Sequence, residues 1–248
     1  MHQPQIIIVQ TGTPPEDIRQ QYGDLPDWFS QAIGVPLKEI LVVRVFDGDE
    51  LPAPDPRRLA IITGSWAMVT EKLPWSEKTA AWIRSAMAVS MPLFGVCYGH
   101  QLMAYALGGE VRYLDSVRET GCLSVSLREA AKNDPLVGTL PDSFPAHLTH
   151  MQTVSRAPQG AKVLADSAAD GHQIVRYGPN AVSTQFHPEF TVAAARALTA
   201  RNREIFGAGG RDTQAIIAGS TQNPEANLSL TAFLAHSVAG YTSLTSTV

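Results

Sequence analysis

A cysteine between two glycines carries the most specific chemical signal in this sequence. The apolar run Pro92–Val96 leads directly into Cys97, within the pattern Gly-x-Cys-x-Gly that extends from Gly95 to Gly99. This pattern predicts a sharp turn from a buried strand into a helix, in which small flanking residues leave the nucleophile accessible. Free N–H groups at the start of that helix would stabilise a thiolate. We therefore predict that Cys97 is a nucleophile, and that the other cysteine, Cys122, is inert.

A histidine at the end of a later apolar run can serve as the base that such a cysteine needs. His187 follows the predicted strand Ala181–Phe186, Pro188 restricts the backbone next to it, and Glu189 comes two residues later. A carboxylate beside an imidazole can hold its tautomer, as in catalytic triads. Cys97, His187 and Glu189 are thus the predicted nucleophile, base and orienting acid. Three other histidines are expected to pack internally or to face solvent: His100, His147 and His172.

Strands and helices alternate in the first half of the chain. Apolar, β-branched runs predict strands at Gln5–Gln10, Leu37–Phe46, Leu59–Thr63 and Pro92–Val96. Helical spacing of apolar residues predicts helices at Trp75–Met87 and Gly99–Leu107. Strands that are separated by helices favour parallel pairing in an α/β fold. We expect an open, mostly parallel, flavodoxin-like sheet flanked by helices.

After Gly109 the predicted strands follow one another with few helices between them, which favours an antiparallel extension of the same sheet. These strands are Val111–Leu114, Leu123–Leu127, Ala161–Ala165, Ile174–Tyr177 and Ala181–Phe186. Helices return at Val192–Phe206 and from Asn223-Pro224 to about Val238, with a glycine-rich joint at 207–210 and a frayed tail at 240–248. We expect one domain over residues 1–206 and a C-terminal helical extension, residues 207–248, that packs on it.

Composition narrows the class of protein. The chain has 248 residues, of which 44% are hydrophobic and 17% charged, and its net charge is −4, so it is predicted to be globular. No basic cluster favours nucleic acid, and no long apolar run favours a membrane span. The N-terminus has no signal-peptide pattern, and two cysteines do not make a disulfide-built fold, so a cytoplasmic location is expected. No phosphate loop or metal-ligand spacing is present, so neither a cofactor nor a metal is predicted.

The residues around the cysteine and the histidine resemble a known family. Residues 95–101, Gly-Val-Cys-Tyr-Gly-His-Gln, together with residues 185–189, Gln-Phe-His-Pro-Glu, are similar to the class I glutamine amidotransferases and their Cys-His-Glu triad. The resemblance covers roughly residues 5–205 and is strongest to the GMP-synthase-like branch. That branch includes glutaminase domains as well as stand-alone γ-glutamyl hydrolases and peptidases.

The resemblance implies a thioester mechanism. Cys97 would attack the γ-carbonyl of a glutaminyl group, and His187 would protonate the leaving ammonia or amine and then activate water. The tetrahedral oxyanion needs two N–H donors. The resemblance assigns these to the backbone of Tyr98 and to the loop after the third strand, at Ser65. Family members often carry two glycines in that loop, where this chain has Gly64-Ser65.

The resemblance also implies residues that bind substrate: Gly64, Gln101, His150 and Met151. Many members carry Ser-His-x-Asp where this chain has Thr149-His150-Met151-Gln152, so the aspartate is missing here. Glu119 and Gly121 resemble a Glu-x-Gly element of the family that we interpret as structural or peripheral. Trp66 either covers the leaving-group side of the site or packs in the core.

Several functions remain open on sequence grounds. The first is a glutaminase that passes ammonia from glutamine to an unknown acceptor and has a separate synthetase as its partner. The second is a stand-alone hydrolase of γ-glutamyl amines or peptides. A non-catalytic interaction protein is disfavoured because Cys97, His187 and Glu189 are all present. A cysteine enzyme of the α/β-hydrolase type is disfavoured because its acid would precede the histidine along the chain.

Overall fold

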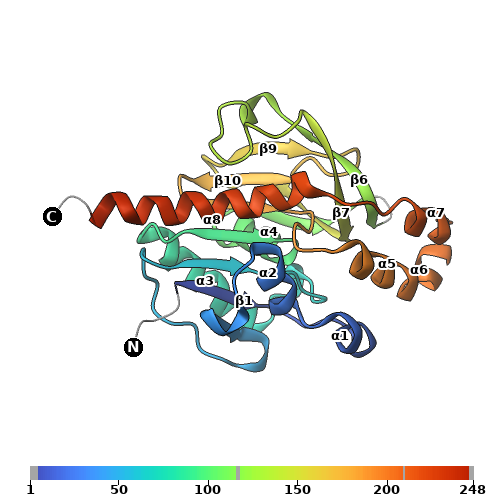
Figure 1. Ribbon diagram of the computed structural model, residues 1–248, viewed down its shortest axis with the longest axis horizontal. Coiled ribbons are helices and arrows are strands. Elements are labelled where there is room, and N and C mark those ends of the chain that lie inside the picture. The colour runs from blue at the N-terminus through green and yellow to red at the C-terminus, as the bar shows by residue number, and fades with distance from the viewer. Residues whose placement is uncertain (1–4, 116–117, 209, 246–248) are drawn as a thin grey trace.

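An open β-sheet between two layers of helices forms the centre of the molecule, which is a computed structural model that describes residues 5–115, 118–208 and 210–245 (Figure 1). Within these residues the main sheet has nine strands. They are β1 (Ile6–Gln10), β2 (Ile40–Arg44), β3 (Leu59–Ile62), β4 (Leu93–Val96), β6 (Glu119–Leu127), β7 (Ser143–His150), β9 (Lys162–Asp166), β10 (Ile174–Gly178) and β11 (Ala181–Thr184). A separate two-stranded ribbon pairs β5 (Glu110–Tyr113) with β8 (Gln152–Arg156).

The strand order confirms the predicted fold class. It runs β2-β1-β3-β4-β11-β10-β9-β6-β7, and the first five of these strands are parallel whereas the rest pair antiparallel. The chain passes from β1 to β2 on one side and then to β3 on the other, which creates a switch point between β1 and β3. In open sheets of this kind, ligands bind beyond the carboxyl ends of the strands at such a point.

Alternate residues of the central strands supply the two faces of the sheet. Ile6 and Ile8 of β1 belong to the core on one side, whereas Ile7 and Val9 belong to the core on the other side. The first core contains residues of α2 (Leu25–Ile33) and α8 (Pro224–Thr245), and the second contains residues of α3 (Pro74–Ala88) and α4 (Tyr98–Ala106). Strands that are buried on both faces in this way explain the uninterrupted apolar runs of the sequence.

The remaining helices gather near one end of the sheet. They are α1 (Glu16–Tyr22), α5 (Val192–Arg201), α6 (Arg203–Ala208) and α7 (Thr213–Ala218). Figure 1 shows α5, α6 and α7 together beside β6 and β7. Side chains of α1, α2 and α5, among them Trp28, form a third, smaller hydrophobic cluster together with Phe190 from the segment before α5. No helix in the described part of the chain has the length and apolar character that crossing a membrane requires.

Several predicted boundaries were wrong. The run Leu37–Phe46 forms only the five-residue strand β2, because 3-10 turns occupy Leu37–Glu39 and Val45–Asp47. The single helix expected at Val192–Phe206 is broken at Asn202, whose side-chain amide donates to the Leu198 carbonyl (2.9 Å) and so bonds back to the last turn of α5. The joint expected at 207–210 is helical through Ala208, and residue 209 lies outside the described residues.

The C-terminal helix extends further than predicted. It continues to Thr245, so residues 240–245 are not a frayed tail, and residues 246–248 lie outside the described residues, as do residues 1–4. Three residues of this helix, spaced four and three positions apart, join the main core: Ala226, Leu230 and Phe233. The rings of Phe94 in β4 and Phe233 are 5.3 Å apart. We propose on this basis that residues 207–248 are an extension that folds onto the domain formed by residues 1–206.

Removing one aromatic side chain of α8 should test that extension. Phe233→Ala is expected to lower the free energy of unfolding by about 3–5 kcal/mol, because Phe233 is fully buried against the sheet. Leu228→Ala on the same helix is the matched control, since Leu228 is 51% exposed, and it should change stability by less than about 0.5 kcal/mol. Urea denaturation measures both. Equal effects of the two substitutions would contradict the packing of α8 on the domain.

Candidate active site

Cys97 occupies a strained turn between β4 and α4. Its backbone has φ 52° and ψ −100°, a region that residues other than glycine rarely adopt. The flanking glycines make the turn possible: a Cβ on Gly95 would lie 2.7 Å from the Gly99 carbonyl, and a Cβ on Gly99 would lie 2.3 Å from the Ile62 carbonyl oxygen. The Cys97 N–H donates to the Thr184 carbonyl of β11 (2.9 Å), which ties the turn to the strand that precedes His187.

His187 and Glu189 follow β11 and face each other. The distance from His187 Nδ1 to Glu189 Oε1 is 2.8 Å, and both side chains are buried. The imidazole stacks on Phe190 with ring centres 4.0 Å apart. The backbone N–H of His187 donates to the backbone carbonyl of His147 in β7 (2.9 Å). These contacts hold the ring with Nδ1 toward the carboxylate. Nε2 is therefore the nitrogen that remains for Cys97 and a substrate.

Gly64 brings the cysteine and the histidine together. A Cβ on Gly64 would lie 3.3 Å from His187 Cε1 and 3.6 Å from Cys97 Cβ, so both side chains lie next to this glycine. Burial alone would lower the pKa of the His187 imidazole, but the charges of Glu189 and Cys97 raise it by more, to about 10. The arrangement therefore favours an imidazolium beside the cysteine at neutral pH.

A cavity of about 300 Å³ opens over these residues. Its volume is at the lower end of the range typical for small-molecule sites. Eight of the nine site residues predicted from sequence line it: Gly64, Ser65, Cys97, Tyr98, Gln101, His150, Met151 and His187. Glu189 is buried beside the imidazole of His187 and does not line the cavity. Much of the lining comes from the loops after β3, β4 and β11 and from the β7–β8 connection, so the site lies at the carboxyl edge of the parallel strands.

Two backbone N–H groups of the cavity wall have no hydrogen-bond acceptor among the described residues. Neither the Ser65 nor the Tyr98 N–H donates a hydrogen bond within the described part of the chain. Their side chains are engaged elsewhere: Ser65 Oγ donates to the Thr11 carbonyl (2.7 Å), and the Tyr98 hydroxyl bonds Ser76 Oγ (2.6 Å). Burial raises the pKa of the Tyr98 hydroxyl to about 12. The backbone rather than the side chain of each residue is thus available to an oxyanion.

Gln101 is bonded to the protein through its amide nitrogen. Nε2 donates to the Gln152 carbonyl (2.7 Å) and to Gln185 Oε1 (2.9 Å). Both amide hydrogens are therefore used, and only the side-chain oxygen remains as an acceptor for a ligand. Gln101 also links the β8 strand to the segment before His187, which is a positioning contact that the sequence did not indicate.

His150 is held in a buried polar network. Its Nδ1 lies 2.9 Å from the Gln152 carbonyl, its Nε2 lies 2.8 Å from Glu119 Oε2, and Asp170 Oδ2 is 3.9 Å from Nδ1. Glu119 also accepts from Ser167 Oγ (2.7 Å), so its predicted structural role fits this position. Glu119, His150 and Asp170 have the composition of a metal site. Both ring nitrogens already face oxygen acceptors, however, so the cluster fits a hydrogen-bonded network better than a set of metal ligands.

Four residues of the site were missed or left undecided by the sequence analysis. Trp66 is 44% exposed and lines the cavity, so it does not pack in the core, and Ile205, which is 62% exposed, lines the same cavity. The stacking partner Phe190 gave no signal beyond its closeness to His187. Arg118 also lines the cavity, and nothing in the local sequence distinguishes it from a surface arginine.

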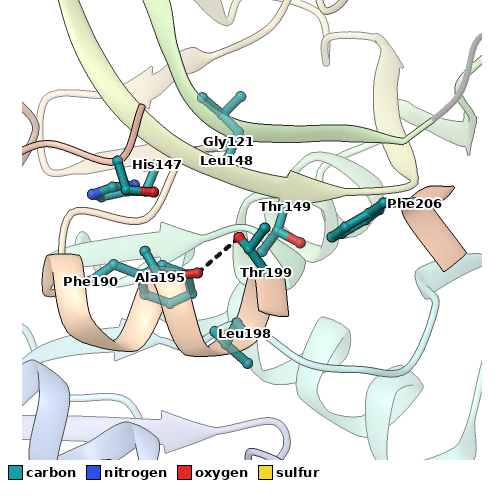
Figure 2. A pocket seen from close by; sticks show the side chains of 10 residues that line it. Gly121, His147, Leu148, Thr149, Phe190, Ala195, Leu198, Thr199 and Phe206 are labelled. Carbon is teal, nitrogen blue, oxygen red and sulfur yellow. Dashed lines mark hydrogen bonds between the residues drawn. The ribbon is translucent and has the colours of Figure 1, made fainter. Parts of the chain in front are cut away.

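A second, much smaller cavity lies behind the wall of the first. Figure 2 shows it between α5, α6 and the β6–β7 pair, with the Thr199 hydroxyl donating to the Ala195 carbonyl (2.9 Å). Thr149, Phe190 and Leu198 line both cavities. Its volume of about 10 Å³ suffices for roughly one water molecule, so it is not a substrate site.

The fold and the site together define a cysteine-centred α/β protein with its candidate catalytic groups at the carboxyl edge of the sheet. The family described as "Glutamine amidotransferase class-I" matches residues 53–204. This chain belongs to the class I glutamine amidotransferase family, as its motifs predicted.

Comparisons with individual proteins agree with that assignment. The chain is 37% identical over 99 residues to the GMP synthase of Bdellovibrio bacteriovorus, covering 40% of this chain and 18% of that protein. It is 35% identical over 105 residues to one subunit of the glutamine-hydrolyzing GMP synthase of Methanococcus maripaludis, covering 42% of this chain and 53% of that protein. The matches thus span about half or less of the length of these curated relatives. The domain is similar to that GMP synthase subunit.

Solved structures share the fold over nearly the whole chain. A glutamine amidotransferase from Thermotoga maritima superposes with a TM-score of 0.75 at 19% identity, covering 96% of this chain and 99% of that one. A glutamine amidotransferase from Methylobacillus flagellatus gives 0.74 at 24% identity, covering 97% and 96%. At these identities the likeness supports the fold alone.

Proposed function

We propose that this protein is a glutaminase of the amidotransferase type, which releases ammonia from the γ-amide of glutamine through a thioester on Cys97. One observation carries the proposal above the others: the side chains of Cys97 and His187 both lie next to Gly64, and Glu189 bonds Nδ1 of the imidazole. Nucleophile, base and orienting acid in mutual contact are what acyl transfer requires.

The proposed reaction has two halves. The Cys97 thiolate attacks the γ-carbonyl carbon, and the C–N bond of the resulting tetrahedral intermediate breaks as the His187 imidazolium protonates the departing ammonia. Water then attacks the γ-glutamyl thioester and gives a proton to His187. Breaking of the C–S bond releases glutamate and restores the thiolate–imidazolium pair. Glu189 keeps Nδ1 protonated throughout, so that Nε2 performs both proton transfers.

Charge that develops on the carbonyl oxygen needs donors at the same place. We assign this role to the backbone N–H groups of Ser65 and Tyr98, two residues that line the cavity and whose N–H groups have no acceptor in the described part of the chain. Preorganised donors of this kind act strongly in a site that excludes water. Gly64, Gln101, His150 and Met151 are the proposed substrate-binding residues. Gly64 and Met151 line the cavity, Gln101 offers its side-chain oxygen, and the buried network fixes the position of His150.

The names of the relatives suggest a partner that would use the ammonia. One of them is named as a GMP synthase component that forms one subunit of the enzyme. We propose that this chain likewise supplies ammonia to a separate synthetase subunit, and that it does so in the reducing cytoplasm, where a catalytic thiol stays reduced.

A second function is favoured by the mouth of the cavity. Trp66 and Ile205 present exposed apolar surface there, which ammonia as a leaving group does not use. A γ-glutamyl amide of a larger, apolar amine would bury that surface. The same thioester chemistry would then make the protein a stand-alone γ-glutamyl hydrolase.

A substrate screen without any partner separates the two functions. For the amidotransferase we expect slow basal hydrolysis of glutamine and no better turnover of γ-glutamyl amines or dipeptides. Steady-state kcat/KM on glutamine, γ-glutamyl alkyl- and arylamides and γ-glutamyl dipeptides provides the comparison. Efficient partner-free cleavage of one of the larger amides, well above the rate on glutamine, would contradict our preference. Trp66→Ala should then reduce kcat/KM for that amide and leave the glutamine rate nearly unchanged.

A further inference from the structure

Arg118 brings a positive charge to the cavity wall, and no carboxylate among the described residues pairs with it. It lies just before β6 and lines the same cavity as Cys97. Its Nε is buried without a hydrogen bond, and no ion pair within residues 5–115, 118–208 and 210–245 includes its guanidinium. Within those residues the guanidinium lies over the Phe206 ring, whose centre is 6.0 Å from the guanidinium carbon.

A second buried arginine, Arg176, has the carboxylate partner that Arg118 lacks among the described residues. Arg176 forms an ion pair with Asp134, with Arg176 Nη2 2.7 Å from Asp134 Oδ1. Burial lowers the pKa of Arg118, and the nearby Cys97 opposes that shift. Removing a charge from water is unfavourable unless a partner compensates it. Among the described residues that line the cavity none is an aspartate or a glutamate, so an anionic ligand would supply the compensating charge.

Strand pairing places Arg118 near His150 and Met151, two of the predicted substrate-binding residues. Strands β6 and β7 pair antiparallel with Glu119 opposite His150 and Thr120 opposite Thr149. Continuing this register by one residue places Arg118 opposite Met151. Phe206, over whose ring Arg118 lies, lines the small cavity together with Thr149, and Figure 2 labels both residues. The cation therefore lies at the end of the cavity that the β7–β8 connection forms.

We propose that Arg118 is the carboxylate-binding residue of this cavity, and that it receives the α-carboxylate of the γ-glutamyl substrate. The inference rests on the proposed function, because the γ-carbonyl attacked by Cys97 and the α-carboxylate belong to the same molecule. A guanidinium presents paired N–H donors that match the two oxygens of a carboxylate. The substrates are accordingly amides whose acyl part carries a free carboxylate, and amides without one are rejected.

A comparison of three amides isolates this contact. Glutamine carries both α-groups, glutaramate lacks the amino group, and 4-aminobutanamide lacks the carboxylate. Arg118→Met should lower kcat/KM for glutamine and glutaramate about 10- to 100-fold, mainly through KM, because a charge-assisted bond is lost. Its rate on 4-aminobutanamide should stay within about threefold of wild type. Arg118→Lys keeps the positive charge but loses the paired N–H donors of the guanidinium. Its kcat/KM for glutamine and glutaramate should lie between the values of wild type and Arg118→Met.

Arg201→Met is the matched control. Arg201 is a half-exposed residue of α5 that pairs with Asp17 (2.7 Å) and does not line the cavity, so its loss removes one charge from the molecule without touching the site. Its three rates should equal those of wild type. Thermal unfolding shows whether Arg118→Met is folded, and its melting temperature should not fall, since an unpaired charge is replaced by an apolar side chain.

Alkylation of Cys97 gives a readout that does not depend on turnover. Iodoacetate is an anion and iodoacetamide is neutral, so Arg118→Met should lower the ratio of their rate constants on Cys97 about tenfold. If no amide is hydrolysed but this ratio still depends on Arg118, the proposed function fails and the carboxylate site stands. If the substitution slows glutamine and 4-aminobutanamide equally, or leaves both the kcat/KM values and the alkylation ratio unchanged, the assignment of Arg118 is overturned.

Discussion

Cys97→Ala is expected to abolish turnover of every substrate that the wild-type protein hydrolyses. The proposed reaction passes through a bond to the Cys97 sulfur, and no other group in the described wall of the cavity can replace it. Removing the nucleophile of a hydrolase triad lowers kcat by an amount on the order of 10⁶-fold. Steady-state ammonia release, followed at high enzyme concentration, measures the residual rate.

Cys122 provides the control for this substitution. It is half-buried in β6, with its sulfur 3.5 Å from Thr221 Oγ1, and it does not line the cavity. Cys122→Ser should keep wild-type kinetics, and a glutamine-like electrophile should label Cys97 alone in the mass spectrum of the intact protein and its peptides. Labelling of Cys122, or retained activity in Cys97→Ala, would remove the cysteine from the proposed mechanism.

His187→Ala is expected to have the second largest effect, a loss of about 10²–10⁴-fold in kcat/KM, the usual contribution of a general acid–base group. In the proposed mechanism the imidazole protonates ammonia and then accepts a proton from water. Glu189→Gln should lose less, because an amide oxygen can still accept from Nδ1–H (2.8 Å in the native pair). Equal kcat/KM of wild type and His187→Ala would contradict the triad.

The pH dependence of kcat/KM tests the role of His187 in a second way. The charges of Glu189 and Cys97 raise the pKa of His187 to about 10, so the imidazolium that protonates ammonia is present at neutral pH and is lost as the pH rises toward 10. The alkaline limb of kcat/KM should therefore lie well above the usual range of a histidine. Glu189→Gln removes one of the two charges, so the limb should move to lower pH. An unchanged limb would show that Glu189 does not act on the imidazole.

The local sequence was sufficient to predict those elements whose conformation depends on residues that are close along the chain. Gly95 and Gly99 predict the turn at Cys97 because both positions exclude a Cβ, and the structure shows those contacts. Apolar, β-branched runs predict β1, β3, β4 and β11 because these strands are buried on both faces. The predicted α/β class and the family follow from these features and are confirmed.

Some elements were missed although their own residues carry signals. The helix α2 has Asp24 as its N-cap, proline in its first turn and Gly34 in the left-handed conformation at its end.

Other missed elements carry no local signal. Strands β7 and β8 contain many polar residues and, in β7, Pro145, so their pattern resembles a loop. Pairing with β6 and β5 supplies the hydrogen bonds that make them strands, and that pairing is not a local property.

Only the tertiary structure decides which distant residues meet. Gly64, Cys97 and His187 come from three loops that are far apart in sequence, and they converge because β3, β4 and β11 are neighbours in the sheet with parallel directions. Arg118 shows the limit most clearly. Its importance depends on the lack of a carboxylate partner among the residues that the structure describes, and such a lack can be recognised only once the neighbouring side chains have been placed. The sequence thus determines the chemistry of each element, whereas strand order and register determine which chemistries share a cavity.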